Sequence, residues 1–511
     1  MHPFPTGPRR QLLTAFLVCF TALGAIGSPG AETQHIDTAT LRSNLGNFLG
    51  QERFAQAAWG IEVVSLDSGI TVFSTNSLSL MKPASNAKLF TGALALDRLG
   101  PQHRIRTSFY AAKPPTKRGT VEGDLVVYGR GDPSLSARFN HGDPEAAVGR
   151  LVAALAAAGI KNVRGDLIGD ESYFKTPGYG TGWTADDLQY YYGAAVSALS
   201  LEDNVIDLEV LPPAISGKPT VIRTRPETAF MTFINHITNA AAGTKRSISI
   251  SRAPGIDLAY VEGSMLASDK PWKDSVSVSN PARWFVYQLR AAMLKNGIRV
   301  RGNIRTLDWH DTVPTPSTNL TEIAFVESED IGTIVTQMMK PSQNLYAQLL
   351  LLQAGRVSGD SAMDSTEDQG ITELKHFIER AGISSKQVLL DDGSGLSRSA
   401  LVTPHAIVDL LRHMDRHPQS SAFRSSLPVA GIDGTLQRRL TSAPALRNIT
   451  AKTGSLKHVR ALSGYVTTAA GERLAFSLIL NNFRAEGSRS GQDELDTIAG
   501  WLASLSEKSQ R

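Results

Sequence analysis

Residues 83–100 read PASNAKLFTGALALDRLG, and this stretch decides how the chain is interpreted. The residues after Lys88 are almost all apolar, so 85–99 is predicted to form a buried helix that ends at Gly100. Ser85 and Lys88 stand three positions apart, and residues at that spacing share one face of a helix. The stretch therefore brings an amine within reach of a hydroxyl.

Serine acyl transfer needs a nucleophilic hydroxyl, a base beside it and donors for the oxyanion. The Ser-x-x-Lys pattern alone is weak evidence, because it also occurs at Ser79–Lys82 and Ser172–Lys175, both in turn-like contexts. The copy at Ser85 opens a helix, where unpaired backbone N–H groups and the positive end of the helix dipole are available. A capping serine beside a solvated lysine is the competing interpretation of this copy when it is taken alone.

A second motif, Lys452-Thr453-Gly454, is followed by Ser455 and occurs once. It stands at the start of a predicted strand. A cation, a hydroxyl and a glycine that permits close backbone approach suit the carboxylate of a substrate. A polar start to a hairpin is the alternative interpretation.

A third motif, Ser-x-Asn, occurs at Ser74, Ser317 and Ser342. Only Ser342-Gln343-Asn344 precedes an apolar helix and so suits an interhelical loop. Ser-x-x-Lys, Ser-Asp-Asn and Lys-Thr-Gly form the signature set of class A β-lactamases and penicillin-binding proteins. Here all three occur in that order, each on the expected type of element. The combination favours an active site over chance.

Other chemistries have little support. No histidine forms a persuasive triad, no His-Glu-x-x-His is present, and neither a metal nor a cofactor is expected. The chain is 41% hydrophobic and 20% charged, which is ordinary for a globular protein. Its net charge is only +4 and its basic residues are dispersed, so nucleic-acid binding is not expected.

Residues 1–27 are predicted to be a signal peptide. An arginine pair at 9–10 precedes an apolar run at 12–26 that is too short to span a membrane, and small residues favour cleavage after Gly27. The general secretory route is favoured, because no Ser or Thr precedes the arginine pair. Cys19 is the only cysteine, so the exported, periplasmic chain is expected to have neither a disulfide nor a membrane span.

The mature chain is predicted to have an α+β architecture in three segments. Residues 28–112 and 280–511 are expected to form one catalytic domain. Residues 113–279, rich in short strands with one helix at 145–158, are expected to be an insertion of one or two subdomains. A strand pair is predicted at 59–66 and 70–74, on either side of the turn signal Asp67-Ser68-Gly69, and two more strands at 461–467 and 473–480.

Three further segments carry a family resemblance: 123–133, 165–170 and Asp392-Gly393-Ser394-Gly395-Leu396-Ser397-Arg398. With the three motifs, they make the chain similar to the low-molecular-mass class C penicillin-binding proteins of the D-alanyl-D-alanine carboxypeptidase/endopeptidase family. The 257 positions from Ser85 to Ser342 fit the large insertion of that family and exceed what a β-lactamase has there. The resemblance implies a transpeptidase-like catalytic domain, an antiparallel sheet flanked by helices.

The resemblance also implies a mechanism. Ser85 would attack the carbonyl of the penultimate D-Ala, and a neutral Lys88 would take its proton. Burial and the charge of Lys452 are expected to lower the proton affinity of Lys88. Ser342 would relay a proton to the leaving amine, while Asn344 would hold Lys88 and a substrate carbonyl.

The oxyanion would be held by the backbone N–H groups of Ser85 and Ser455. The substrate-binding residues that the resemblance implies are Lys452, Thr453, Gly454, Ser455 and Arg398. Peptidoglycan peptides are the expected substrate and β-lactams the expected inhibitors. The middle residue of the Ser342 motif is Gln343, where Asp is commoner. This difference is expected to alter the tuning of the active site without loss of function.

Two alternative functions remain open from the sequence. One is a serine β-lactamase-like hydrolase, which would share the acylation step. The other is a catalytically idle module that binds cell wall or penicillin. The balance of carboxypeptidase and endopeptidase activity and the oligomeric state are also left open.

Overall fold

The computed structural model describes residues 35–214, 218–241, 243–311, 319–357, 365–485, 487 and 489–509. The predicted signal peptide, its Cys19 and the Ser317 motif lie outside the described residues. Within the described ranges, no helix has the length and apolar character needed to cross a bilayer.

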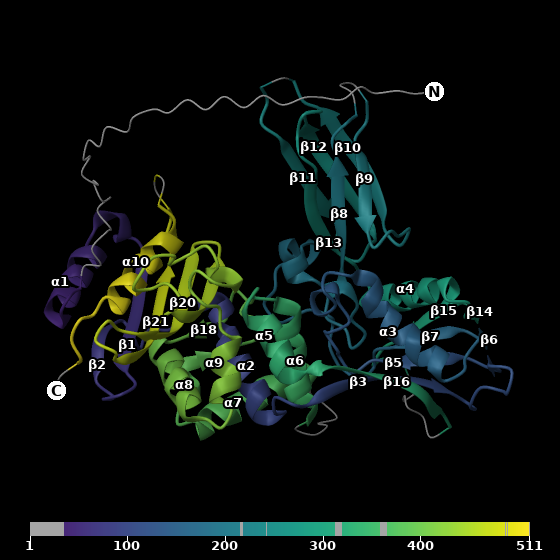
Figure 1. Cartoon of the computed structure of the whole chain (residues 1–511), viewed down its shortest axis with the longest axis horizontal. Coiled ribbons are helices and arrows are strands. Elements are labelled where there is room, and N and C mark those ends of the chain that lie inside the picture. The colour runs from purple at the N-terminus through teal and green to yellow at the C-terminus, as the bar shows by residue number, and fades with distance from the viewer. Residues whose placement is uncertain are drawn as a thin grey trace, which may run out of the picture. The chain divides into compact units, whose positions relative to one another are not determined.

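The motifs lie on and around a five-stranded antiparallel sheet (Figure 1). Its strand order is β19-β20-β21-β1-β2, so the two ends of the described chain share one sheet. The strands predicted at 59–66, 70–74, 461–467 and 473–480 are confirmed within one or two residues. The strands are β1 (Ala58–Ser65), β2 (Thr71–Thr75), β19 (Thr450–Leu456), β20 (Val459–Thr467) and β21 (Arg473–Asn481).

Both faces of this sheet are buried, which explains why β20 and β21 are apolar on both sides. On β20, Ala461 and Tyr465 face one core while Leu462 and Val466 face the other, as the two-residue period of a strand requires. Helices α1 (Thr38–Leu49) and α10 (Gly491–Ala503) cover one face. The other core holds α2 (Ala87–Arg98), α5 (Ile331–Met339), α6 (Asn344–Val357), α7 (Thr366–Arg380), α8 (Pro404–Arg416) and α9 (Ser420–Ser426).

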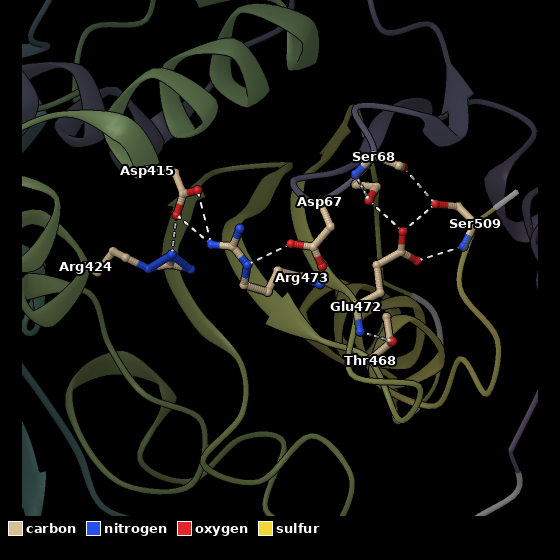
Figure 2. A network of polar contacts seen from close by, with 9 residues as sticks. Asp67, Ser68, Asp415, Arg424, Thr468, Glu472, Arg473 and Ser509 are labelled. Atoms are coloured by element: carbon tan, nitrogen blue, oxygen red, sulfur yellow. Dashed lines mark hydrogen bonds and ion pairs between the residues drawn. The ribbon is translucent and has the colours of Figure 1, made fainter. Parts of the chain in front are cut away.

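A polar network at one end of β21 ties the C-terminal tail to this sheet (Figure 2). The buried carboxylate of Glu472 accepts a hydrogen bond from Ser65 Oγ at 2.6 Å and another from the backbone N–H of Ser509 at 2.9 Å. Next to it, Arg473 binds Asp67 at 2.9 Å and reaches Asp415 of α8 at 3.3 Å. The network therefore joins four separate segments of the catalytic region.

A second core is built on another five-stranded sheet, of order β15-β7-β5-β3-β16. Helices α3 (Pro144–Ala157), close to the helix predicted at 145–158, and α4 (Pro281–Lys295) contribute to this core. The strands are β3 (Arg104–Ala111), β5 (Leu125–Tyr128), β7 (Leu167–Asp170), β15 (Ile304–Leu307) and β16 (Thr321–Asp330). A small sheet adds β4 (Thr120–Val121), β6 (Asn162–Val163) and β14 (Arg299–Val300).

Two three-stranded sheets follow in the middle of the chain. Strand β8 (Val205–Leu211) is central in one of them, and β12 (Leu258–Met265) is central in the other. Their partners are β9 (Val221–Arg225) and β13 (Trp272–Ser277) for β8, and β10 (Thr232–Asn239) and β11 (Ser247–Arg252) for β12. The remaining strands, β17 (Val388–Leu389) and β18 (Leu401–Val402), form a short pair.

The insertion boundaries predicted at 113 and 279 remain a prediction, and the strand pairing suggests moving them. Strand β3 pairs with β16 across more than 200 positions, with Ala111 opposite Thr321. Phe109 and Trp284, just outside the predicted limits, are buried in the second core. We therefore propose that the insertion extends over about 104–330.

Candidate active site

Ser85 lies in a tight turn that leads directly into helix α2. The turn is a 3-10 segment at Ala84–Asn86, and Ala84 has a φ of 47°, in the left-handed region that residues with a Cβ seldom adopt. Asn86 is fully buried and donates from Nδ2 to Ser463 Oγ of β20 at 2.7 Å. The turn is thus anchored to the central sheet, and Ser85 is only partly buried.

Lys88 is fully buried, and its ammonium is held by three acceptors. Its Nζ lies 2.9 Å from Ser85 Oγ, 2.5 Å from Asn344 Oδ1 and 2.8 Å from the carbonyl oxygen of Ser394. The predicted i, i+3 pair and the predicted contact of Asn344 with Lys88 are therefore both present in the structure.

The amine of Lys88 is tuned toward the neutral form. Burial lowers the pKa of Lys88 to about 7, and the nearby carboxylate of Asp392 opposes that effect. The charge of Lys452 was also expected to lower the pKa of Lys88, but it is not among the causes of that shift. Instead, burial and then the charge of Lys88 lower the pKa of Lys452 well below its usual value.

Lys452 is also fully buried and bridges β19 to the loop before α6. Its Nζ donates to Ser342 Oγ at 2.8 Å and to the carbonyl oxygen of Thr453 at 2.9 Å. Ser342 has a φ of 67°, so this loop also holds a residue in the left-handed region. Two lysine–hydroxyl pairs, Ser85 with Lys88 and Ser342 with Lys452, thus form the centre of the site.

Gly454 allows β19 to approach the nucleophile turn. A Cβ at this position would stand 2.6 Å from the carbonyl oxygen of Pro83, which is too close. The next residue, Ser455, is exposed, and Thr453 donates to Thr435 Oγ1 at 2.8 Å. The backbone of β19 therefore lies directly against the turn that carries Ser85.

Asp392 is a site residue that residue patterns did not single out, although the segment 392–398 carried part of the resemblance. Its buried carboxylate accepts from Ser394 Oγ at 2.5 Å, from the Gly395 N–H at 3.0 Å and from Trp183 Nε1 at 2.9 Å. These bonds fix the loop whose Ser394 carbonyl holds Lys88. Asp392 therefore acts on Lys88 through both geometry and charge.

Arg398 stands apart from the other predicted residues. Its guanidinium pairs with Asp187 of the insertion at 3.0 Å and donates to the Leu396 carbonyl at 2.8 Å. In the described residues it bonds to none of Ser85, Lys88, Ser342 or Lys452. Its role in substrate binding remains a proposal.

The competing motif copies do not assemble a site. Ser79 and Ser172 lie in turns, and Ser79 is exposed, whereas Lys88 of the third copy is fully buried. In the described part of the chain, no group of three or more His, Cys, Asp or Glu side chains is arranged to hold a metal ion. The arrangement suits a serine nucleophile with a lysine base, with acylation and deacylation on the same hydroxyl.

Comparison with known proteins identifies the family. The model of the D-Ala-D-Ala carboxypeptidase 3 (S13) family matches residues 41–505. The chain belongs to this family. The D-alanyl-D-alanine carboxypeptidase of Actinomadura sp. (strain R39) is 32% identical, over 96% of this chain and 92% of that protein. The predicted family and enzyme class, a serine-type D-Ala-D-Ala carboxypeptidase, are therefore confirmed.

Solved structures confirm the predicted α+β penicillin-binding fold of this carboxypeptidase. Penicillin-binding protein 4 (dacB) of Haemophilus influenzae has a TM-score of 0.75 at 24% identity, covering 91% of this chain and 98% of that one. The same protein complexed with a β-lactam has a TM-score of 0.70 at 23% identity, covering 89% and 98%.

A Gly395→Ala substitution is expected to damage this carboxypeptidase's active site. Gly395 has a φ of 75°, and a Cβ there would stand 2.0 Å from the carbonyl oxygen of Ala84, next to Ser85. We expect a loss of about 3 kcal/mol in the free energy of unfolding, from backbone strain plus overpacking, and a slower reaction at Ser85. Denaturant unfolding and the rate of penicillin labelling check both effects.

Gly382→Ala is the matched control, because Gly382 has a similar φ of 79° but open space where the Cβ would be. It should cost about 1 kcal/mol and leave labelling unchanged. Equal effects of the two substitutions would show that the contact with Ala84 is unimportant.

Proposed function

We propose that Ser85 carries the D-Ala-D-Ala carboxypeptidase reaction of this chain. One observation carries the proposal: Lys88 Nζ lies 2.9 Å from Ser85 Oγ while burial lowers its pKa to about 7. An ordinary lysine is protonated at neutral pH, so only a neutralised amine can accept the serine proton.

In acylation, Ser85 Oγ bonds to the carbonyl carbon of the penultimate D-Ala, and Lys88 receives the hydroxyl proton. The oxyanion accepts hydrogen bonds from the backbone N–H groups of Ser85 and Ser455. The C–N bond then breaks, and the terminal D-Ala leaves as an amine after it gains a proton. Water then hydrolyses the acyl-enzyme: its hydroxyl group bonds to the acyl carbon, the bond to Ser85 Oγ breaks, and the remaining proton of the water goes to Ser85 Oγ.

Ser342 relays to the leaving amine the proton that Lys88 received, because its hydroxyl gives up its own proton and takes that one in return. Lys452 holds Ser342 Oγ in place at 2.8 Å. Lys452, Thr453 and Ser455 hold the terminal carboxylate of the substrate. That anion favours the charged form of Lys452 and so offsets the effect of burial. Arg398 contributes to substrate binding at the side of the insertion, where it is held by Asp187.

Penicillin acylates the same serine in this proposal, and peptidoglycan peptides are the natural substrate. Support comes from the fold shared with a Haemophilus influenzae protein that has been crystallised with a β-lactam. A substrate in the cell wall agrees with the export that residues 1–27 predict. We therefore propose a periplasmic enzyme, with carboxypeptidase and endopeptidase activity to be separated by experiment.

The acylation rate is expected to rise with pH through about 7, because Lys88 acts only when it has lost its proton. The neutral fraction would be about one tenth at pH 6 and about nine tenths at pH 8, so the rate should rise roughly tenfold. Stopped-flow measurement of penicillin acylation from pH 5.5 to 9 checks this. A rate that keeps rising toward pH 10 would mean that Lys88 has an ordinary pKa.

Digestion of purified peptidoglycan with product identification tests the function. Free D-Ala is the expected product, and split cross-links would add endopeptidase activity. If penicillin labels the protein but neither product forms, the chain is a non-catalytic module. A short-lived penicilloyl adduct with rapid penicillin turnover would instead indicate a β-lactamase-like hydrolase.

A further inference from the structure

A carboxylate of the insertion lies directly behind the Ser342–Asn344 loop. Asp203 belongs to a tight turn, Glu202–Asn204, whose three residues all have positive φ, at 51°, 54° and 57°. The turn is pinned by Asn204, which accepts from the Leu201 N–H at 3.1 Å and donates to the Ala195 carbonyl at 2.8 Å. Asp203 is 8% exposed.

Asp203 accepts hydrogen bonds from the loop between Ser342 and Asn344 and from the helix α6 that follows it. Gln343 Nε2 donates to its Oδ2 at 3.2 Å, and the Tyr346 hydroxyl donates to its Oδ1 at 2.5 Å. Arg138 of the insertion donates to Oδ2 at 2.7 Å and supplies a compensating charge. One carboxylate therefore holds the residue between Ser342 and Asn344 and also the first turn of α6.

The loop needs such support, because its conformation is unfavourable on its own. Ser342 adopts a φ of 67°, which persists only where the surroundings impose it. The same loop aims Ser342 Oγ at Lys452 and Asn344 Oδ1 at Lys88, at 2.8 and 2.5 Å. A displacement of about 1 Å in such a site costs about a hundredfold in rate.

The contact also accounts for the unusual middle residue of the motif. An acid at position 343 would face the carboxylate of Asp203 at a buried site, where two like charges are strongly unfavourable. Gln343 presents a donor instead, and its Oε1 accepts from the Leu345 N–H at 3.2 Å. Gln343 and Asp203 therefore match as a donor and an acceptor.

We propose that Asp203 is a positioning residue for acylation, through which the insertion holds Ser342 and Asn344 in their reactive arrangement. The proposal rests on the proposed roles of those two residues. It gives the insertion a direct part in catalysis in addition to any binding role.

The test is a double-mutant cycle on the second-order rate constant of penicillin acylation. Asp203→Asn removes the charge and leaves one acceptor oxygen for the three donors Gln343, Tyr346 and Arg138, and Gln343→Glu would place a carboxylate against Asp203. We expect each single variant to acylate about 10- to 100-fold more slowly. The double variant Asp203→Asn/Gln343→Glu restores one donor and one acceptor, so its rate should return to within about fivefold of the wild type.

Three comparisons make the result decisive. Asp207→Asn is the matched control, because Asp207 lies on β8 and has no described hydrogen bond to Gln343 or Tyr346, and its acylation rate should be unchanged. Tyr346→Phe removes one donor without changing charge and should slow acylation about 3- to 10-fold, which keeps the test open if Asp203→Asn fails to fold. Thermal unfolding midpoints separate a purely structural effect from a catalytic one.

The proposal is overturned if the folded single variants acylate at the wild-type rate, or if the double variant is as slow as the product of the two single effects. Either result would leave Asp203 a structural residue only. Failure of the proposed function would look different, because the wild-type protein itself would then form no adduct at Ser85.

Discussion

A Ser85→Ala variant is expected to form no covalent adduct with penicillin and to release no D-Ala from a D-Ala-D-Ala peptide. Without Oγ there is no atom to carry the acyl group, and loss of a catalytic serine typically lowers kcat by about 10⁶-fold. The fold should survive, because Ser85 is only partly buried and Asn86 still anchors the turn to β20. Intact-mass analysis of the penicillin-treated protein makes the measurement.

Ser79→Ala is the matched control for this variant, because Ser79 belongs to a competing Ser-x-x-Lys copy but lies exposed in a turn. It should be labelled as fully as the wild type. A stoichiometric adduct on the Ser85→Ala variant would mean that another residue is the nucleophile.

A Lys88→Ala variant is expected to acylate roughly 10²- to 10⁴-fold more slowly, the usual contribution of a positioned general base. The variant loses the amine that lies 2.9 Å from Ser85 Oγ and 2.5 Å from Asn344 Oδ1. Stopped-flow acylation measures the rate. The unfolding midpoint should shift by only a few degrees, because the substitution also removes the cost of burying an amine, and this offsets the lost hydrogen bonds. The pH dependence through 7 should disappear as well.

Lys82→Ala controls for the removal of a lysine close to the site. Lys82 is half-buried, and its backbone N–H donates to Asn481 Oδ1 at 2.8 Å, a bond that the substitution keeps. Its acylation rate should stay within about twofold of the wild type. If Lys88→Ala acylated as fast as Lys82→Ala, a different group would have to be the base.

The structure brings together residues that the sequence had singled out, because each stands beside a strong local signal. Ser85 stands just before the apolar helix α2, Lys452 lies near the start of β19, and Ser342 precedes a run of leucines. The predicted helix begins two residues late, at Ala87, but the 3-10 turn that precedes it still brings Lys88 to 2.9 Å from Ser85. The resemblance also implied that Asn344 holds Lys88, and the structure places these two residues, 256 positions apart in the chain, 2.5 Å from each other.

The rest of the site depends on contacts that no local pattern encodes. Asp392 acts on Lys88 through a loop whose backbone N–H groups donate to the Asp392 carboxylate, and Asp203 contacts Gln343 across 140 positions. Gln343 was expected to change only the tuning of the motif. The role of Gln343 follows from its contact with Asp203, because a hydrogen-bond donor in place of an acid is favourable next to a buried carboxylate.

The insertion boundaries were hard to place for a related reason. The local sequence of strands β3 and β16 does not encode their partner, and their pairing joins Ala111 to Thr321 across 210 positions. Local composition changes near 113, but the hydrogen-bonded sheet begins earlier, at Arg104. Long-range strand pairing therefore supports the proposed boundaries near 104 and 330.

The central claim is that Ser85 becomes acylated during the reaction. The most direct measurement is fragmentation mass spectrometry of the peptide carrying residues 54–88, after the acyl-enzyme is trapped with penicillin or quenched during turnover of a D-Ala-D-Ala peptide. The account predicts that both acyl groups are found on Ser85. An acyl group on any other residue, or turnover without an acylated intermediate, would contradict it.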